Sequence, residues 1–240
     1  MMDVLDTFHL LDGRDTMFDF RKVGNDPQLI QEVYKLRYKV YCDEWGFEKP
    51  EDHPDGIEID NFDKHSVHFA AFREDDGKLI GTVRLIRFSG EGFPLFSHCS
   101  VDADLSFLGE NAVGEISRLA ISKELRRRRP DNALYDGEMR ELEEDVTPLA
   151  VRERRKNENA IVLGLYRCLY KESIDTGITH LYAVMARGLF LLLKRISINF
   201  RQIGPEVNYH GLRTPYILDL AQMMVDLKEK NPQLYQYFKD

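Results

Sequence analysis

Residues 113–122, VGEISRLAIS, decide the fold. They form a short run that is rich in apolar and β-branched residues and bounded by turn residues, which is typical of a buried strand. The run also carries one carboxylate, Glu115, and one guanidinium, Arg118. Because an unpaired charge is costly to bury, two ionised groups on a core strand indicate a functional site.

The spacing of these two charges predicts an irregularity in the strand. A regular strand points residues three apart to opposite faces. If Glu115 and Arg118 serve one site, the strand needs a β-bulge, which resets the alternation. Gly114 and Ser117 are plausible positions, so we predict a bulge within residues 113–118. An uninterrupted ladder there would leave at most one of the two charges in the site.

The composition bounds the class of protein. The chain has 240 residues, 43% hydrophobic and 31% charged, which is typical of a globular protein with a substantial core. It has no apolar run of about 18 residues, so no membrane span is expected, and its N-terminus lacks the pattern of a signal peptide. A formal net charge of −8 disfavours general nucleic-acid binding. Three scattered cysteines without CxxC spacing favour a reducing cytoplasm and argue against a zinc site, and we expect no bound metal.

The hydrophobic periodicity predicts alternating strands and helices. The predicted elements are a strand at 17–23, a helix at 27–43, a long loop at 44–65, strands at 66–73, 78–88 and 113–122, a helix at 159–175, a strand at 179–185, a helix at 187–195, a strand at 198–203, a helix at 214–228 and a short closing helix. Without repeats or linkers, we expect a single α/β domain over 1–240. It would carry a charged insertion at about 130–158, with a short helix at 136–145, and a C-terminal helical extension at about 205–240.

Charged residues outside the central strand are further candidates. Arg37 lies on or beside the apolar stripe of the first helix, where it could also pack as a stem with its head in water. The long loop holds Glu58, Asp60 and Asp63, three carboxylates within six residues. They form either a solvated acidic turn or a site for a cationic amine, or for a base that deprotonates one. Arg84 interrupts the apolar face of its strand, unless that strand is a solvent-facing edge.

The order of elements resembles GNAT-type acyltransferases, which implies a mixed, mostly antiparallel sheet, flanked by helices and splayed between its central strands. The charged residues resemble the pattern of acyl-homoserine-lactone autoinducer synthases, in the same order and with similar gaps. The residues that carry this resemblance are Arg37, the Glu58-x-Asp60-x-x-Asp63 motif, Arg84 in GTVRLI, and Glu115-x-x-Arg118 in EISRLAI. Tyr41 stands where that family has phenylalanine.

A closer resemblance covers nearly the full length. The blocks LRYKVYCDEWGFE, DGIEIDNFDKHSVHF, GTVRLI, EISRLAIS, LYKESIDTGITHLYAVM and IGPEVNYHGLRTPY are similar to the PEP-CTERM/exosortase-system-associated acyltransferases. That group is related to the autoinducer synthases and to N-acyl amino acid synthases. The autoinducer synthases do not share the block at 204–216, which argues against homoserine lactone itself as the product. The resemblance implies N-acyltransferase chemistry and leaves the acceptor open.

Acyl transfer to an amine assigns roles to these residues, because the amine must lose a proton and the thioester carbonyl must be polarised. The residues assigned to catalysis are Glu58, Glu115 and Arg84, with either glutamate as the general base, directly or through a water. The residues assigned to substrate binding are Arg37, Tyr41, Asp60, Asp63 and Arg118. Asp60 and Asp63 would position the loop or pair with the arginines, and Cys42 is expected to be a core residue.

The acyl donor is predicted from the segment that follows the central strand. It reads SKELRRRRP and has no glycine, which disfavours a tight nest of N–H groups for a pyrophosphate. The run Arg126, Arg127, Arg128 and Arg129 predicts a docking surface for the acidic acyl carrier protein, although it could also be a solvated basic loop. We expect acyl carrier protein or CoA thioester as co-substrate and no tightly bound cofactor.

The leading prediction is an enzyme that moves a fatty acyl group from the carrier protein to the amine of a small molecule, such as an amino acid. The alternatives are an autoinducer synthase that uses S-adenosylmethionine and a short-chain N-acetyltransferase that uses acetyl-CoA. A binding module without activity would be favoured if Glu58, Arg84 and Glu115 shared no cleft.

Overall fold

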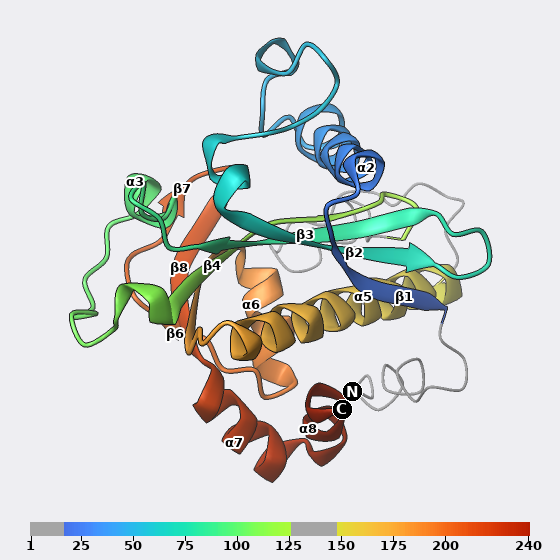
Figure 1. Ribbon diagram of the computed structural model, residues 1–240. Helices are drawn as coiled ribbons and strands as arrows, with labels where there is room; N and C mark the ends of the chain where they lie inside the picture. The colour runs from blue at the N-terminus through green and yellow to red at the C-terminus, as the bar shows by residue number, and fades with distance from the viewer. Residues whose placement is uncertain (1–16, 126–147) are drawn as a thin grey trace.

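The computed structural model describes residues 17–125 and 148–240. Its strands lie in the order β1-β2-β3-β4-β5-β8-β6, and β7 pairs with β8 (Figure 1). All these pairs are antiparallel except β4 and β5, which are parallel. The strands are β1 (Phe18–Val23), β2 (Ser66–Arg73), β3 (Leu79–Arg87), β4 (Val113–Ile121), β5 (His180–Met185), β6 (Arg201–Gln202), β7 (Val207–Asn208) and β8 (Leu212–Asp219).

Helices cover the two faces of this sheet unequally (Figure 1). Helix α2 lies over one face, and α5 crosses the other, where α6, α7 and α8 also lie. The helices are α2 (Pro27–Tyr38), α3 (Leu95–His98), α5 (Pro148–Asp175), α6 (Arg187–Arg195), α7 (Leu220–Lys230) and α8 (Pro232–Lys239). Short helical turns are η1 (Lys39–Glu44), η2 (Pro50–Asp52), η3 (Asn61–His65) and η4 (Glu110–Ala112). No helix in 17–125 or 148–240 is long and apolar enough to cross a membrane.

Helix α5 forms the main core with the sheet. Its fully buried Ile161, Leu165 and Leu169 pack against the apolar face of the sheet. Gly164 faces the ring of Phe20, and a Cβ at this glycine would lie 2.3 Å from a ring carbon. The main core therefore lies on the α5 face of the sheet, and the polar groups of the site lie on the opposite face.

Helix α2 begins as its sequence predicts. Asp26 accepts hydrogen bonds from the amides of Gln28 and Leu29, and Pro27 occupies the first helical position. After Tyr38 the helix continues as a π-helical turn, a feature that is frequent at functional sites.

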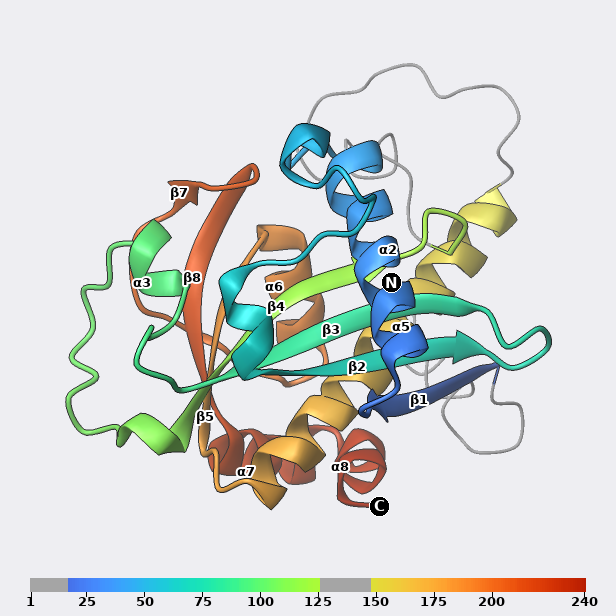
Figure 2. The same ribbon diagram turned by 45° about the horizontal axis from the view of Figure 1, so that its top comes forward.

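The sheet splays between its central strands, as the GNAT resemblance implies. β4 and β5 pair only from Val113 to Ile116 and from His180 to Ala183. Beyond that point β4 runs away from β5 and its partner β8, and Figure 2 shows the resulting V. The pairing of β4 with β5 therefore ends one residue after Glu115.

The predicted bulge exists, but it lies at the end of the predicted interval. Arg84 pairs with Ser117, whereas Thr82, two residues earlier, pairs with Ala120, so β4 has one extra residue between Ser117 and Ala120. Arg118 has a positive φ of 51°, which fits a bulge. The ladder is regular from Gly114 to Ser117.

Several predicted boundaries are wrong. The helix predicted at 214–228 is preceded by strand β8 and begins only at Leu220, where Asp219 accepts a hydrogen bond from the Gln222 amide. The C-terminal segment is therefore not purely helical. The strand predicted at 198–203 is reduced to β6. Helix α5 begins at Pro148, so the end of the predicted charged insertion is helical. The short helix predicted at 136–145 lies outside the described residues.

Candidate active site

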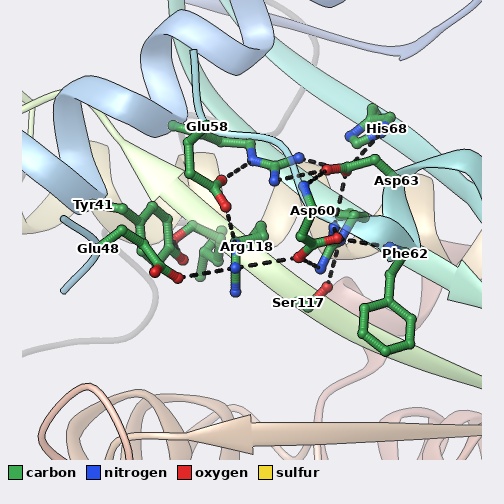
Figure 3. Close-up of polar contacts among 12 residues, drawn as sticks. Tyr41, Glu48, Glu58, Asp60, Phe62, Asp63, His68, Ser117 and Arg118 are labelled. Carbon is green, nitrogen blue, oxygen red and sulfur yellow. Dashed lines mark hydrogen bonds and ion pairs between the residues drawn. The ribbon is translucent and has the colours of Figure 1, made fainter. Parts of the chain in front are cut away.

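A network of buried and partly buried charges lies between α2, the long loop, β3 and β4 (Figure 3). Three arginines and four carboxylates share it, and they come from segments more than 80 residues apart in the sequence. The members are Arg37, Arg84, Arg118, Glu48, Glu58, Asp60 and Asp63. Apart from Glu48, each was predicted from the sequence.

Arg37 is the innermost member, on the last turn of α2. Its side chain is fully buried. Its Nε lies 2.5 Å from Oε2 of Glu58, and its Nη1 lies 2.6 Å from Oδ1 of Asp63. Burial alone would raise the pKa of Glu58, but Arg37 and Arg118 lower it below its usual value. Burial also opposes ionisation of Asp63, but the nearby arginines, Arg37 above all, hold the pKa of this carboxyl far below its usual range. Both carboxylates are therefore ionised and neutralised.

Arg84 joins the loop to the sheet. It is only 1% exposed, so it does not lie on a solvent-facing edge. Its Nη1 and Nη2 donate to the two carboxylate oxygens of Asp60 at 2.6 and 2.9 Å, and its Nε donates to Oγ of Ser117 at 2.9 Å. Nη1 also lies 2.9 Å from Oδ1 of Asp63. Protein groups therefore occupy every nitrogen of this guanidinium.

The acidic loop is closed on itself as well. Oδ1 of Asp60 accepts from the amide of Phe62, and Oδ2 of Asp63 accepts from the amide of Asp60 at 2.8 Å. This capping box starts η3 and fixes both carboxylates relative to the backbone. The two aspartates thus position the loop and also pair with the arginines, which are the two roles expected from their spacing.

Arg118 reaches the network because of the bulge. Its Nε donates to Oε1 of Glu58 at 3.0 Å, and its Nη2 lies 3.1 Å from Glu48 and 3.2 Å from Asp60. Its guanidinium carbon lies 5.3 Å from the ring centre of Tyr41, a cation–π distance. Arg118 therefore faces the open side of the network, while Arg37 closes its inner side.

Glu115 stands apart from these ion pairs. It is 3% exposed, and its described hydrogen-bond partner is the amide of Leu95, 3.0 Å from Oε2. Phe93 and Tyr182 belong to the apolar cluster around this part of β4. Burial raises the pKa of Glu115 to about 7, although the Leu95 amide and the distant Arg84 and Arg118 oppose this. Of the two predicted base candidates, only Glu115 titrates near neutrality.

A hairpin formed by β7 and β8, which was not predicted, contacts the long loop beside the site. At its tip, the Tyr209 ring stacks on His98 with ring centres 4.0 Å apart. His210 lies 3.5 Å from Oε1 of Glu48 and 5.4 Å, between ring centres, from Phe47. The sequence NYHGL contains a turn signal between two short strands, which could have indicated the hairpin.

The remaining predicted residues have three different outcomes. The Tyr41 hydroxyl donates to the carbonyl of Leu119 at 3.2 Å, so this side chain belongs to the wall of the site. Cys42 is buried, and burial raises the pKa of its thiol to about 11, which fits a core residue. Arg126, Arg127, Arg128 and Arg129 lie outside the described residues. Within 17–125 and 148–240, no group of three histidines, cysteines or acidic residues could hold a metal ion.

The comparisons with known proteins agree with this fold. A family model described as an acetyltransferase (GNAT) domain matches residues 36–136, which include every member of the charged network. No curated protein matches the sequence.

Solved structures match over most of the chain. TofI in a ternary complex with an inhibitor and MTA is 18% identical with a TM-score of 0.58, covering 91% of this chain and 99% of TofI. BjaI, described as a CoA-dependent acyl-homoserine lactone synthase with SAM and isopentyl-CoA, is 15% identical with a TM-score of 0.59, covering 93% and 88%. FeeM, an N-acyl amino acid synthase from uncultured soil microbes, is 15% identical with a TM-score of 0.53, covering 87% and 94%.

The splayed mixed sheet, the family match and these structural similarities agree with one another. The chain thus carries a match to the GNAT acetyltransferase domain over residues 36–136 and has the fold of acyl-homoserine-lactone synthases and an N-acyl amino acid synthase.

Proposed function

We propose that this protein is an N-acyltransferase that moves an acyl chain from a thioester to the amine of a small molecule, with Glu115 as the general base. One observation carries the proposal. Glu115 is a buried carboxyl whose pKa is raised to about 7 by burial, and it lies where β4 and β5 begin to splay. A base with a pKa near the working pH combines a useful ionised fraction with sufficient basicity.

The proposed reaction needs one base and no redox partner. The amine arrives as an ammonium ion and loses one proton to solvent on becoming a free amine. Its nitrogen attacks the thioester carbonyl carbon, the carbon–sulfur bond breaks, and the thiolate leaves. The second proton passes from the nitrogen to Glu115, directly or through a water, and finally to the thiolate. The products are an amide and a thiol.

The splay offers a place for the donor. β4 continues to Ile121 after its pairing with β5 ends at Ile116. Unpaired backbone groups at a strand edge can bind an extended chain by β-type hydrogen bonds. We expect the thioester arm to lie there, with its carbonyl beside Glu115 and the bulge.

The charged network has a supporting role in this proposal. Arg37, Arg84, Glu58 and Asp63 are at least nine-tenths buried and neutralise one another, so proton transfer by Glu58 would first require its release from two arginines. We therefore assign these four residues to positioning. Their function is to hold the long loop and Arg118 in place beside Glu115.

The proposal extends to the acyl donor and to the biological setting. The run at 126–129 favours acyl carrier protein, because four adjacent arginines suit an acidic partner. BjaI is described as CoA-dependent, so acyl-CoA is the alternative donor. The sequence blocks named above support a place among the PEP-CTERM/exosortase-associated acyltransferases, working in the cytoplasm.

A second candidate is autoinducer synthesis from S-adenosylmethionine. It is favoured by the structural similarity to BjaI with bound SAM and to TofI with bound MTA. FeeM, described as an N-acyl amino acid synthase, favours the amino acid acceptor instead. The two candidates share Glu115 and differ in the product.

The test is mass spectrometry of small molecules from cells that overproduce the protein, with E115Q as the matched control. We expect N-acylated amines with the wild type and a strong reduction with E115Q, which keeps the shape of the side chain. An acylated lactone would select the autoinducer alternative. Identical metabolite profiles for wild type, E115Q and empty vector would contradict the proposal.

A further inference from the structure

Arg213, on strand β8, has a different setting from the arginines of the charged network. Arg37, Arg84 and Arg118 each pair with at least two carboxylates. Arg213 is partly buried, yet in 17–125 and 148–240 it has no carboxylate partner. Its hydrogen bond is from Nη1 to the carbonyl of the neighbouring Leu212, at 3.0 Å.

Arg213 nevertheless lies at the site. Its guanidinium carbon is 5.5 Å from the ring centre of Phe47, the residue before Glu48. The same Phe47 ring lies 6.2 Å, between ring centres, from Tyr41, over which Arg118 lies on the network side. Arg213 and Arg118 thus border one aromatic wall, and only Arg118 is neutralised by protein carboxylates.

The hairpin that carries Arg213 packs against the site at its tip. His210 and Gly211 at its tip have positive φ angles of 53° and 85°. Glycine adopts a positive φ freely, and histidine is enriched among the other residues that do, so both suit a tight turn. Contacts with neighbouring elements hold the turn in place. Here the contacts are the stack of Tyr209 on His98 and the approach of His210 to Glu48.

We propose that Arg213 binds the free carboxylate of the acceptor, so that the acceptor is an amino acid or a similar amine that carries a carboxylate. This inference rests on the proposed function and narrows its substrate class. The planar guanidinium suits bidentate binding of a carboxylate. The ammonium end would face Glu48 and Asp60, whose side chains are 24% and 25% exposed, more than those of the other network carboxylates.

The electrostatics agree with this geometry. Burial lowers the pKa of Arg213, and the nearby Tyr41 opposes this only in part. An arginine stays charged in proteins, so a partly desolvated guanidinium without a counter-ion is destabilising by itself. A carboxylate from the acceptor would supply the missing counter-ion at the moment of binding.

The experiment compares amino acids with their carboxamides, using KM values expressed for the free amine, so that the two acceptors differ in the carboxylate charge. The purified full-length wild type and R213Q are given a fatty acyl thioester, on CoA and on acyl carrier protein, with each L-amino acid or its carboxamide. For wild type we expect amides to be poorer acceptors than acids. In R213Q, KM for the acid should rise roughly 10- to 100-fold, as expected for the loss of a charged hydrogen-bonding partner, with KM for the amide unchanged. R213K should recover part of the loss, since lysine keeps the positive charge but cannot bind a carboxylate through two parallel N–H groups.

One control variant and two distinct outcomes separate the possible failures. Arg201→Gln removes one exposed positive charge from neighbouring β6 and should leave both KM values unchanged. Equal use of acids and amides by wild type, or equal losses for both in R213Q, would overturn the inference and leave the acyltransferase proposal standing. If wild type acylates no amine of any kind, the proposed function fails, and this inference fails with it.

Discussion

Glu115 and Arg118 lie three residues apart on β4 and yet serve the same face of the sheet. The bulge after Ser117 inserts one extra residue, so Arg118 turns toward the carboxylates above the sheet, where Arg84 already binds Ser117. The two charges meet different surroundings. Arg118 contacts three carboxylates, whereas Glu115 receives one amide hydrogen bond in an apolar setting. This difference separates the residue that we assign to proton transfer from the residues that hold the site together.

The raised pKa of Glu115 predicts an unusual dependence of stability on pH. Its pKa is about 4.5 in the unfolded chain and about 7 in the folded one, so the folded state binds more protons between these values. The free energy of unfolding should therefore fall as the pH rises through this window. The E115Q variant does not ionise at this position. It should be more stable than wild type by about 3 kcal/mol at pH 8, and by much less at pH 4.5. Urea unfolding of both proteins at several pH values measures this difference in the free energy of unfolding. A stability difference that does not change with pH would show that Glu115 is not buried as described.

Arg37 should be the most important member of the network for stability. Replacing it with methionine leaves Glu58 and Asp63 buried next to an apolar side chain. Removal of one partner of a buried ion pair typically destabilises a protein by about 3–5 kcal/mol. Thermal or urea unfolding of R37M measures the loss. K35M, at an exposed position of the same helix, is the control and should change stability by less than about 0.5 kcal/mol. A similar small effect for R37M would contradict the assigned positioning role.

The arginine run at 126–129 is predicted from the sequence to be a docking surface for acyl carrier protein. Changing Arg126, Arg127, Arg128 and Arg129 to glutamate should raise the apparent KM for an acyl carrier protein donor, because the docking charges are reversed. The kcat value should change little, and the effect should shrink at high salt. Steady-state kinetics with carrier-protein and CoA donors, at two ionic strengths, measure KM and kcat for each donor. An unchanged KM, or efficient use of acyl-CoA by wild type, would favour a solvated basic loop.

Much of the fold and site follows from local sequence. The period of two in the strand around Arg84 places this residue on an apolar face, and the spacing of Glu115 and Arg118 predicts a bulge if both residues serve one site. Those arguments use only neighbouring residues, and the structure agrees with them apart from the exact position of the bulge.

The rest depends on contacts that local sequence does not encode. Thr214-Pro215 has the signature of a helix start, yet it lies within β8, where the two residues pair with Met185 and Val184 of β5. His210 was missed because it gains a role only when the hairpin folds onto the loop more than 150 residues earlier, and Glu48 was missed because its partner Arg118 lies 70 residues later, on β4. The choice between Glu58 and Glu115 as base also required structure, since their pKa values differ through burial and partners rather than residue type.

The most direct test of the account is the pH dependence of kcat/KM for wild type and E115Q, measured with the same amine and thioester. The ratio of the two values removes the contribution of the amine's own ionisation. We predict that wild type exceeds E115Q by roughly 10²–10⁴-fold above pH 7. Below about pH 7, the pKa of Glu115, the ratio should fall tenfold per pH unit. A ratio near one, or a ratio that stays constant from pH 5 to pH 9, would contradict Glu115 as the base.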